Sequence, residues 1–157
     1  KILASQDPGL SKQLGVVVFG KQAEQYASLF PFPIYPMNYV SNEKELVDIY
    51  NAVDLYVTPS LQDNLPNTIV EAMACGIPCV GFNVGGIPQM IDHLHNGYVA
   101  EYQSAKDLAN GIRWTLTEGE YDNLSEEACR KALSSYSESI ISMRYIDIYN
   151  KITGSHA

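Results

Sequence analysis

The segment from residue 56 to residue 86 constrains the fold of this chain most strongly. It reads as an apolar strand, a polar loop, a short helix, a second apolar strand and a Gly-Gly turn. Pro66 suits the first turn of the helix, because its missing N–H would have no partner there. Asp63 and Glu71 flank the start of the same helix. Free N–H groups at a helix N-terminus attract phosphate, and a nearby carboxylate can accept hydrogen bonds from sugar hydroxyls, so the segment predicts an anion site.

Composition narrows the classes of partner. The chain has 157 residues, of which 46% are hydrophobic, so it can form one domain with a core that needs no crosslinks. Its net charge of -8 argues against nucleic acid or an anionic membrane surface as a direct partner, because both require clustered Lys and Arg. Residues 45–101 contain no Lys or Arg. A phosphate bound near Pro66 would therefore be neutralised by backbone dipoles or by residues distant in sequence.

Neither the cysteines nor the histidines follow the spacing of a metal site. The three cysteines are odd in number and lie in apolar or helical segments, which favours reduced thiols over disulfides. His93 and His95 directly precede Asn96-Gly97, which predicts a surface turn rather than a metal or proton-transfer pair. No segment reaches the ~18 apolar residues of a membrane span, and no signal peptide is evident. We therefore expect a cytoplasmic protein.

Apolar runs and helical periodicities alternate along the chain. Strands are expected at 16–20, 34–35, 54–58, 79–82 and 98–100. Helices are expected within 1–14, where residues 7–9 break the pattern, then at 21–30, 42–52, just after Pro66, and at 87–92, 104–118, 120–135 and 137–152. This alternation indicates an α/β fold with a doubly wound parallel sheet and ligands at the carboxyl ends of the strands. The apolar run 16–19 predicts a strand buried on both faces.

Local signals refine two of these helices. Asn42 followed by Glu45 is a capping-box spacing, which predicts where the 42–52 helix begins. Trp114 lies on the apolar side of the 104–118 helix and is expected in the core. The last helix carries an apolar stripe made of Ile141, Tyr145, Ile148 and Tyr149.

Four blocks of residues, in this order, resemble the C-terminal, nucleotide-sugar-binding domain of the retaining GT-B glycosyltransferases. They are Tyr50-Asn51-Ala52-Val53-Asp54-Leu55-Tyr56-Val57-Thr58-Pro59-Ser60, Glu71-Ala72-Met73-Ala74-Cys75-Gly76-Ile77-Pro78, Gly85-Gly86-Ile87-Pro88 and Asn96-Gly97-Tyr98. Ordered blocks at consistent spacing are far more specific than any one of them. The resemblance spans residues 16–152 and implies a Rossmann-like doubly wound sheet with helices on both faces, one half of a GT-B fold. Residues 1–157 are then a single nucleotide-sugar-binding domain.

The resemblance assigns roles to both carboxylates. The family's central motif is a Glu, seven residues and a second Glu, which places Asp63 and Glu71 at the acidic positions as the candidate catalytic residues. It implies that Glu71 holds the ribose of the donor nucleotide. It implies that Asp63, one methylene shorter than the usual Glu, lies near the transferred sugar. A Gly-Phe-Gly-like stretch often follows the first acid; this chain has Asn64-Leu65-Pro66 there, and Pro66 can donate no hydrogen bond.

The same resemblance gives a set of expected donor-binding residues. They are Tyr39, Val40, Ser60, Asn64, Leu65, Pro66, Asn67, Thr68, Glu71, Gly85 and Gly86. Tyr39 and Val40 correspond to the place where the family's nucleobase packs, and burial of Val40 in the core fits the pattern equally well. Simpler interpretations exist for the rest: Glu71 could face solvent, Asp63 could only cap the helix, and the Gly-Gly pair could be only a tight turn.

By resemblance, the chain is the donor half of an enzyme that transfers a sugar from a nucleoside diphosphate to a glycan or lipid-linked acceptor, with retention at the anomeric carbon. The chain has no Asp-x-Asp motif, so we expect no metal and no cofactor. The family's first strand, its basic pair and its acceptor-binding domain are expected to precede Lys1. We therefore expect this chain alone to be inactive, and the missing domain to bring it to the inner membrane face. Bacterial surface polysaccharide synthesis is one candidate process.

Two further classes of protein fit parts of the pattern. A non-catalytic nucleotide-sugar-binding or interaction module would keep this fold without the basic pair. A flavodoxin-like receiver domain would need acids clustered at strand ends, and only Asp54, at a strand start, comes close. Gln89 stands where many members of the resembling family have an acid, which leaves no charge at that position.

Overall fold

The computed structural model describes residues 1–19, 23–26, 29–37 and 40–154. Its strands are β1 (Val16–Phe19), β2 (Ile34–Met37), β3 (Tyr56–Thr58), β4 (Cys79–Phe82) and β5 (Gly97–Ala100). Its helices are α1 (Ile2–Gln6), α2 (Pro8–Ser11), α3 (Glu43–Asn51), α4 (Asn67–Ala74), α5 (Ile87–Met90), α6 (Ala105–Thr117), α7 (Tyr121–Tyr136) and α8 (Glu138–Thr153), with a 3₁₀ helix η1 (Ala23–Tyr26). Strands and helices therefore alternate as the sequence predicts.

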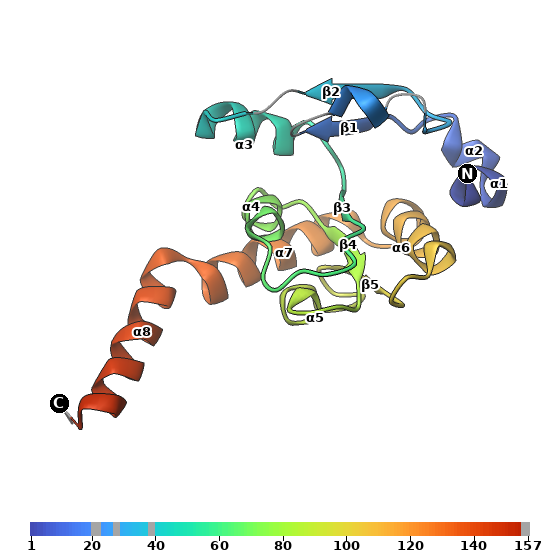
Figure 1. The fold of residues 1–157 in the computed structure, drawn as a ribbon. Helices are drawn as coiled ribbons and strands as arrows, with labels where there is room; N and C mark the ends of the chain where they lie inside the picture. Colours follow the sequence, from blue (N-terminus) through green and yellow to red (C-terminus); the bar gives the residue numbers. More distant parts are fainter. Residues whose placement is uncertain (20–22, 27–28, 38–39, 155–157) are drawn as a thin grey trace.

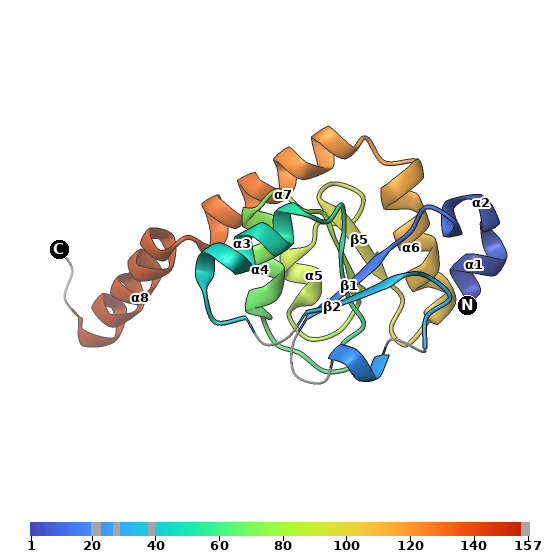
Figure 2. The ribbon, with the colours of Figure 1, turned by 90° about the horizontal axis from the view of Figure 1, so that it is seen from above.

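All strand pairs are parallel, as predicted for this α/β fold. β3, β4 and β5 pair in that order, so that Val57 aligns with Val80 and Val80 with Tyr98. α6 lies on one side of these strands, and α4 and α7 lie on the other (Figures 1 and 2). The doubly wound arrangement with helices on both faces is thereby confirmed.

The strands form two hydrogen-bonded groups instead of the single sheet that we expected. Among the residues that the structure describes, β1 pairs with β2 alone, and β3 pairs with β4 along one edge, over three residues. Every residue of β1 is half-buried, so the prediction of a strand buried on both faces is wrong. Half-burial of all four residues shows that the described elements do not fully cover the faces of β1. Pro36 in β2 aligns with Val18, which suits an edge strand because proline cannot donate to a further one.

Side-chain caps explain where several helices begin. The Oδ1 of Asn42 accepts hydrogen bonds from the N–H groups of Lys44 at 2.9 Å and Glu45 at 3.5 Å, which confirms the predicted start of α3. Such a cap contributes about 1 kcal/mol. The Asp7 carboxylate accepts from the N–H of Leu10 at 2.8 Å. The break predicted at residues 7–9 is therefore the start of a second helix, α2.

The core lies where α4, α7 and β4 meet. Its buried members are Tyr50, Ile69, Ala72, Met73, Ile77, Cys79, Ile87, Met90, Ile91, Ala128 and Ala132. Burying a side chain such as Ile69 or Met73 stabilises the fold by about 1.5–3 kcal/mol. On the opposite side, α6 packs closely on β5, because a Cβ on Gly111 would lie 2.5 Å from the Tyr98 ring. Trp114 is half-buried and contacts that same ring, so it lies at the border of the core.

The last helix differs from the others. α8 has no buried residue and extends away from the rest of the molecule (Figures 1 and 2). Its exposed large apolar side chains are Met143, Tyr145, Ile146, Ile148, Tyr149 and Ile152. The helix and most of its predicted stripe are therefore present, but the stripe is not covered. Within the part of the chain that the structure describes, no helix is long and apolar enough to cross a membrane.

Candidate functional site

Glu71 lies on α4 and is held by a tyrosine from α3. Its side chain is half-buried, and its Oε2 accepts a hydrogen bond from the Tyr50 hydroxyl at 3.0 Å. The Thr68 carbonyl lies 3.3 Å from the same hydroxyl. Burial, followed by the hydrogen bond to Glu71, raises the pKa of Tyr50. The phenol therefore stays protonated at neutral pH and remains a donor.

A second tyrosine, Tyr56 of β3, contacts the first turn of α4. The Tyr56 hydroxyl donates to Thr68 Oγ1 at 2.8 Å. Burial raises the pKa of Tyr56, and the hydrogen bond with Thr68 partly offsets that rise. Asp63 lies in the loop before α4 and Glu71 lies on the second turn of that helix, and the roles assigned to them stay predictions.

The N-terminus of α4 opens this region to an anion. Pro66 is the N-cap residue with extended backbone rather than the first helical residue, and no described side chain caps the helix. The first N–H groups of a helix have no partner within it, so those of Asn67 and Thr68 are available to a ligand. Asn64, Leu65 and Asn67 are exposed beside them. This geometry can bind phosphate oxygens without a basic side chain.

The Gly85-Gly86 turn lies directly against the loop that carries Asp63. Gly85 has a φ of 54°, and a Cβ there would lie 1.6 Å from the Asp63 carbonyl oxygen. A Cβ on Gly86 would lie 1.8 Å from the carbonyl oxygen of Asn64. Both positions therefore require glycine. The loops after β3 and β4 meet at the carboxyl ends of these strands, where α/β folds place ligands.

The remaining predicted residues lie at different positions around this region. Ser60 is half-buried at the end of β3, and its Oγ lies 3.0 Å from the Thr58 hydroxyl. Val40 is half-buried, which fits neither full burial in the core nor a fully open position. Tyr39 lies outside the described residues.

Sequence reasoning missed three tyrosines that shape the site. It placed Tyr50 in the apolar periodicity of a helix and Tyr56 in a strand. A hydrogen bond across 21 residues leaves no signal in either pattern. The third, Tyr102, follows β5 and donates to the Leu61 carbonyl at 3.1 Å, in the loop that carries Asp63. Tyr102 lies two residues after β5, and no local pattern marks its contact across 41 residues.

The described residues contain no group of three or more His, Cys, Asp and Glu side chains that could hold a metal ion. His93 and His95 are exposed in the turn before β5, as predicted, and His93 Nδ1 accepts from the N–H of Val99 at 3.1 Å. All three cysteines are free thiols, and burial raises the pKa of Cys79. The absence of a metal and of a cofactor stays a prediction.

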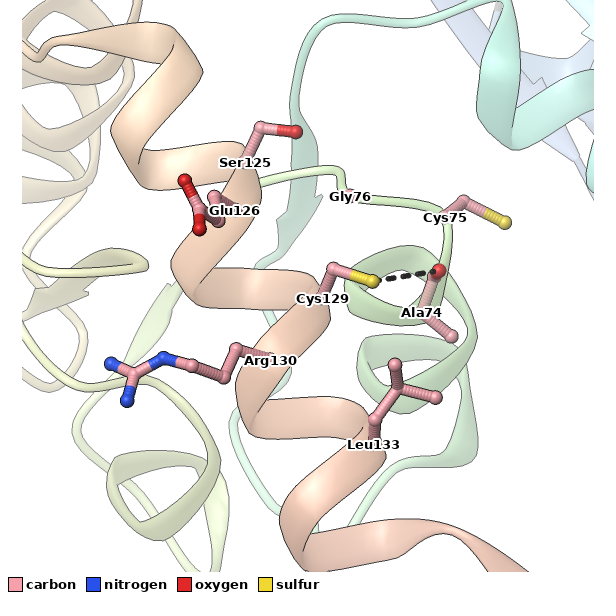
Figure 3. Close-up of a pocket in the computed structure, with 8 residues that line it drawn as sticks. All are labelled: Ala74, Cys75, Gly76, Ser125, Glu126, Cys129, Arg130 and Leu133. Atoms are coloured by element: carbon pink, nitrogen blue, oxygen red, sulfur yellow. Dashed lines mark hydrogen bonds between the residues drawn. The ribbon is translucent and has the colours of Figure 1, made fainter.

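A surface hollow lies between α7 and the C-terminal end of α4 (Figure 3). Its lining residues are Ala74, Cys75, Gly76, Ser125, Glu126, Cys129, Arg130 and Leu133. The Cys129 thiol points to the Ala74 carbonyl at 3.7 Å, while the Cys75 thiol points away from it. None of the predicted donor-binding residues lines this hollow, so it is separate from the region of Asp63 and Glu71.

Comparisons with known proteins show the family of this chain. Residues 36–132 match the family described as "Glycosyl transferases group 1". The N,N'-diacetylbacillosaminyl-diphospho-undecaprenol alpha-1,3-N-acetylgalactosaminyltransferase of Campylobacter jejuni is 30% identical over 74% of this chain and 31% of its own length. The N-acetyl-alpha-D-glucosaminyl L-malate synthase of Bacillus anthracis is 29% identical over 71% of this chain and 29% of its own length. The chain thus spans under a third of these relatives.

Solved structures share the fold. HepE of Anabaena in complex with UDP matches with a TM-score of 0.78 and 19% identity, over 95% of this chain and 43% of that chain. The sucrose-phosphate synthase of Thermosynechococcus elongatus also has a TM-score of 0.78 and 19% identity, over 99% of this chain and 42% of that one. The predicted half of a GT-B fold is therefore confirmed at the level of architecture.

Proposed function

The chain belongs to the family of glycosyl transferases group 1, and from this premise we propose that it binds the nucleoside diphosphate sugar of a retaining sugar transfer. One observation carries the proposal. The loop of Asp63 packs on the Gly85-Gly86 turn beside a helix N-terminus that no described side chain caps, with Glu71 on that helix. This arrangement offers donors for phosphate oxygens and acceptors for sugar hydroxyls within one region.

Each part of the region has a proposed role. The first N–H groups of α4, at Asn67 and Thr68, hold the diphosphate, and Glu71 accepts a hydrogen bond from the ribose. Asp63 and the Gly-Gly turn lie against the transferred sugar. The contribution is mainly electrostatic, because fixed dipoles stabilise the charge that develops on the leaving diphosphate.

The chemistry needs no separate base in this proposal. The bond between the anomeric carbon and the diphosphate breaks, and the acceptor oxygen bonds to the same face of that carbon. The proton of the acceptor hydroxyl passes to an oxygen of the departing diphosphate. Asp63 and Glu71 therefore serve recognition and are not an acid and base pair of the glycosidase kind.

The relatives suggest the donor and the acceptor. HepE was crystallised with UDP and with UDP-glucose. The names of a Campylobacter jejuni and an Escherichia coli relative include diphosphoundecaprenol-linked sugars. We propose a uridine or other nucleoside diphosphate sugar as donor and a lipid-linked glycan as acceptor. In this proposal a further, N-terminal domain binds the acceptor at the inner membrane face, and the process is bacterial surface polysaccharide synthesis.

The positions of the basic side chains limit what this chain does alone. Ion pairs join Arg113 to Glu118, Arg130 to Glu127 and Lys131 to Asp92. None of these partners belongs to the predicted donor-binding set. Residues 45–101, which carry Asp63, Glu71 and the Gly-Gly turn, contain no Lys or Arg, so within this segment the dipole of α4 supplies the positive potential for the diphosphate. We therefore propose that the chain binds the donor and that residues outside it complete the transfer.

Titration calorimetry with UDP, GDP and ADP tests this proposal. Glu71→Ala is expected to lower the affinity for the bound nucleotide at least about tenfold, because a charged acceptor for the ribose is lost. Glu126→Ala is a matched control, since Glu126 is an exposed helical Glu in the hollow of Figure 3. It should bind as the wild type does. The proposal is wrong if folded protein binds none of the three nucleotides or if both variants lose affinity equally.

A further inference from the structure

Tyr50 is enclosed beside the proposed donor site. Its side chain is 1% exposed, although it lies on α3, whose other face is open to solvent. The ring packs edge-on against Phe19 at the end of β1, with 5.8 Å between ring centroids. It packs in the same way against Tyr56 of β3 at 6.1 Å. Two rings from different strands therefore fix where the Tyr50 hydroxyl points.

The hydroxyl has one hydrogen and two acceptors within reach. Oε2 of Glu71 lies at 3.0 Å and the Thr68 carbonyl oxygen at 3.3 Å. The carboxylate is both closer and charged, so it forms the stronger bond. A tyrosine hydroxyl is protonated at neutral pH, and burial raises the pKa of Tyr50 further, so this donor is present throughout the neutral pH range.

The carboxylate of Glu71 has little other support. The Tyr50 hydroxyl is the one described group that donates to it, and no described Lys or Arg forms an ion pair with it. A basic partner would satisfy both oxygens and would neutralise the charge. A single internal donor instead holds Oε2 and leaves Oε1 able to accept from a ligand.

We propose that Tyr50 is a positioning residue, whose hydroxyl holds Oε2 of Glu71 so that Oε1 accepts a hydrogen bond from a ribose hydroxyl of the donor. This inference rests on the proposed function of Glu71. A glutamate side chain has three rotatable bonds, and ordering it before the ligand arrives reduces the entropy lost on binding. The helix scaffold and the buried ring supply that order.

A purely structural role would give the same static picture. The bond between Tyr50 and Glu71 also ties α3 to α4, so its loss could loosen the fold without any specific effect on ribose. Tyr56 offers a matched comparison, because its hydroxyl donates to Thr68 Oγ1 at 2.8 Å on the same helix and does not contact Glu71. Tyr50→Phe and Tyr56→Phe each remove one such hydroxyl.

The experiment measures ribose preference in the full-length protein. The probes are whichever of UDP, GDP and ADP binds the wild type best, with its 2′-deoxy and 3′-deoxy forms, in titration calorimetry. The wild type should prefer the ribose form over one deoxy form by about tenfold. Tyr50→Phe should bind the ribose form about tenfold more weakly and bind that deoxy form within about twofold of wild type, so the preference disappears. Tyr56→Phe should keep the preference.

Each result decides between a positioning role and a purely structural one. The inference is overturned if Tyr50→Phe keeps the wild-type preference, or if both tyrosine variants lose it equally. Should Glu71→Ala lose the preference while Tyr50→Phe retains it, the proposed function stands and the positioning role fails. If the wild type binds none of the three nucleotides, both fail.

A second variant guards against misfolding of Tyr50→Phe. Phe19→Leu removes one of the two rings that fix Tyr50 but leaves its hydroxyl in place. It should reduce the ribose preference about threefold, because the hydroxyl is then less well directed. An unchanged preference in Phe19→Leu would contradict the idea that ring packing directs the hydroxyl to Glu71.

Discussion

Glu71 and Asp63, the two carboxylates of the proposed donor site, are held by different kinds of contact. Glu71 lies on a helix and is fixed by one side chain, the hydroxyl of the buried Tyr50. Asp63 lies on a loop whose backbone rests on the Gly85-Gly86 turn, with no room for a Cβ between them. The proposed ribose side thus depends on side-chain hydrogen bonds, and the proposed sugar side depends on backbone packing.

This difference has a physical consequence. A side-chain hydrogen bond contributes about 0.5–1.5 kcal/mol and can be removed while the backbone stays in place. A backbone contact cannot be altered without moving the whole loop. The helix side is therefore suited to tuning affinity, and the loop side determines the shape of the site.

Gly85→Ala should give the largest effect, because it attacks the backbone contact. Gly85 has a φ of 54°, and the added Cβ would overlap the Asp63 carbonyl oxygen. Left-handed strain and overpacking together should lower the free energy of unfolding by about 3 kcal/mol. The displaced loop should also abolish nucleotide binding. Urea unfolding and calorimetry measure the two effects.

Gly154→Ala measures the cost of left-handed backbone strain in the absence of a steric overlap. Gly154 also has a left-handed backbone, with a φ of 69°, but nothing lies within 4 Å of its added Cβ. Strain alone should lower the free energy of unfolding by about 1 kcal/mol and leave nucleotide binding unchanged. Equal effects of the two substitutions would show that loop packing at Gly85 contributes little.

The helix side should respond to high pH. Burial, with the Glu71 hydrogen bond, raises the pKa of Tyr50 above its ordinary value of 10.0, so the unfolded chain releases this proton at lower pH than the fold does. The stabilisation is complete below about pH 10 and falls above it, by at most about 1.4 kcal/mol per pH unit for one tyrosine. Tyr50→Phe should show a shallower loss between about pH 10 and 11 in urea unfolding. Parallel curves for the two proteins would contradict this.

The sequence predicts the backbone of this site better than its side-chain contacts. The strand, loop, helix, strand and Gly-Gly turn from Tyr56 to Gly86 follow from local patterns, and the cap at Asn42 confirms the start of α3. These features depend on neighbours in sequence. The contact of Tyr50 with Glu71 joins two helices, and periodicity marks Tyr50 only as apolar.

The errors have the same origin. The run Val16–Phe19 reads as a fully buried strand, yet its exposure depends on which elements cover the faces of the sheet, which no local pattern contains. Periodicity predicts the apolar stripe on α8 but not what lies against it, and no described element covers it. The close contact of Gly85 with Asp63 is similar, because the two glycines predict a turn but not what lies against it.

Removing one tyrosine hydroxyl on the helix side and one on the loop side gives the most sensitive test of the difference between the two sides of the site. Tyr56 donates to Thr68 Oγ1 at 2.8 Å on the helix side, and Tyr102 donates to the Leu61 carbonyl at 3.1 Å on the loop side. Tyr102 is 46% exposed, so water can replace its hydroxyl, whereas Tyr56 is half-buried. Tyr56→Phe should lower the free energy of unfolding by about 1 kcal/mol and Tyr102→Phe by about 0.3 kcal/mol.

Urea unfolding of both single variants and of the double variant measures these values. The two losses should add, because the hydroxyls share no hydrogen-bond partner. A loss for Tyr102→Phe as large as that for Tyr56→Phe would mean that the Asp63 loop also depends on a side-chain bond. The proposed sugar side would then also be held by a side chain. The difference between the two sides would rest on the Gly85→Ala result alone.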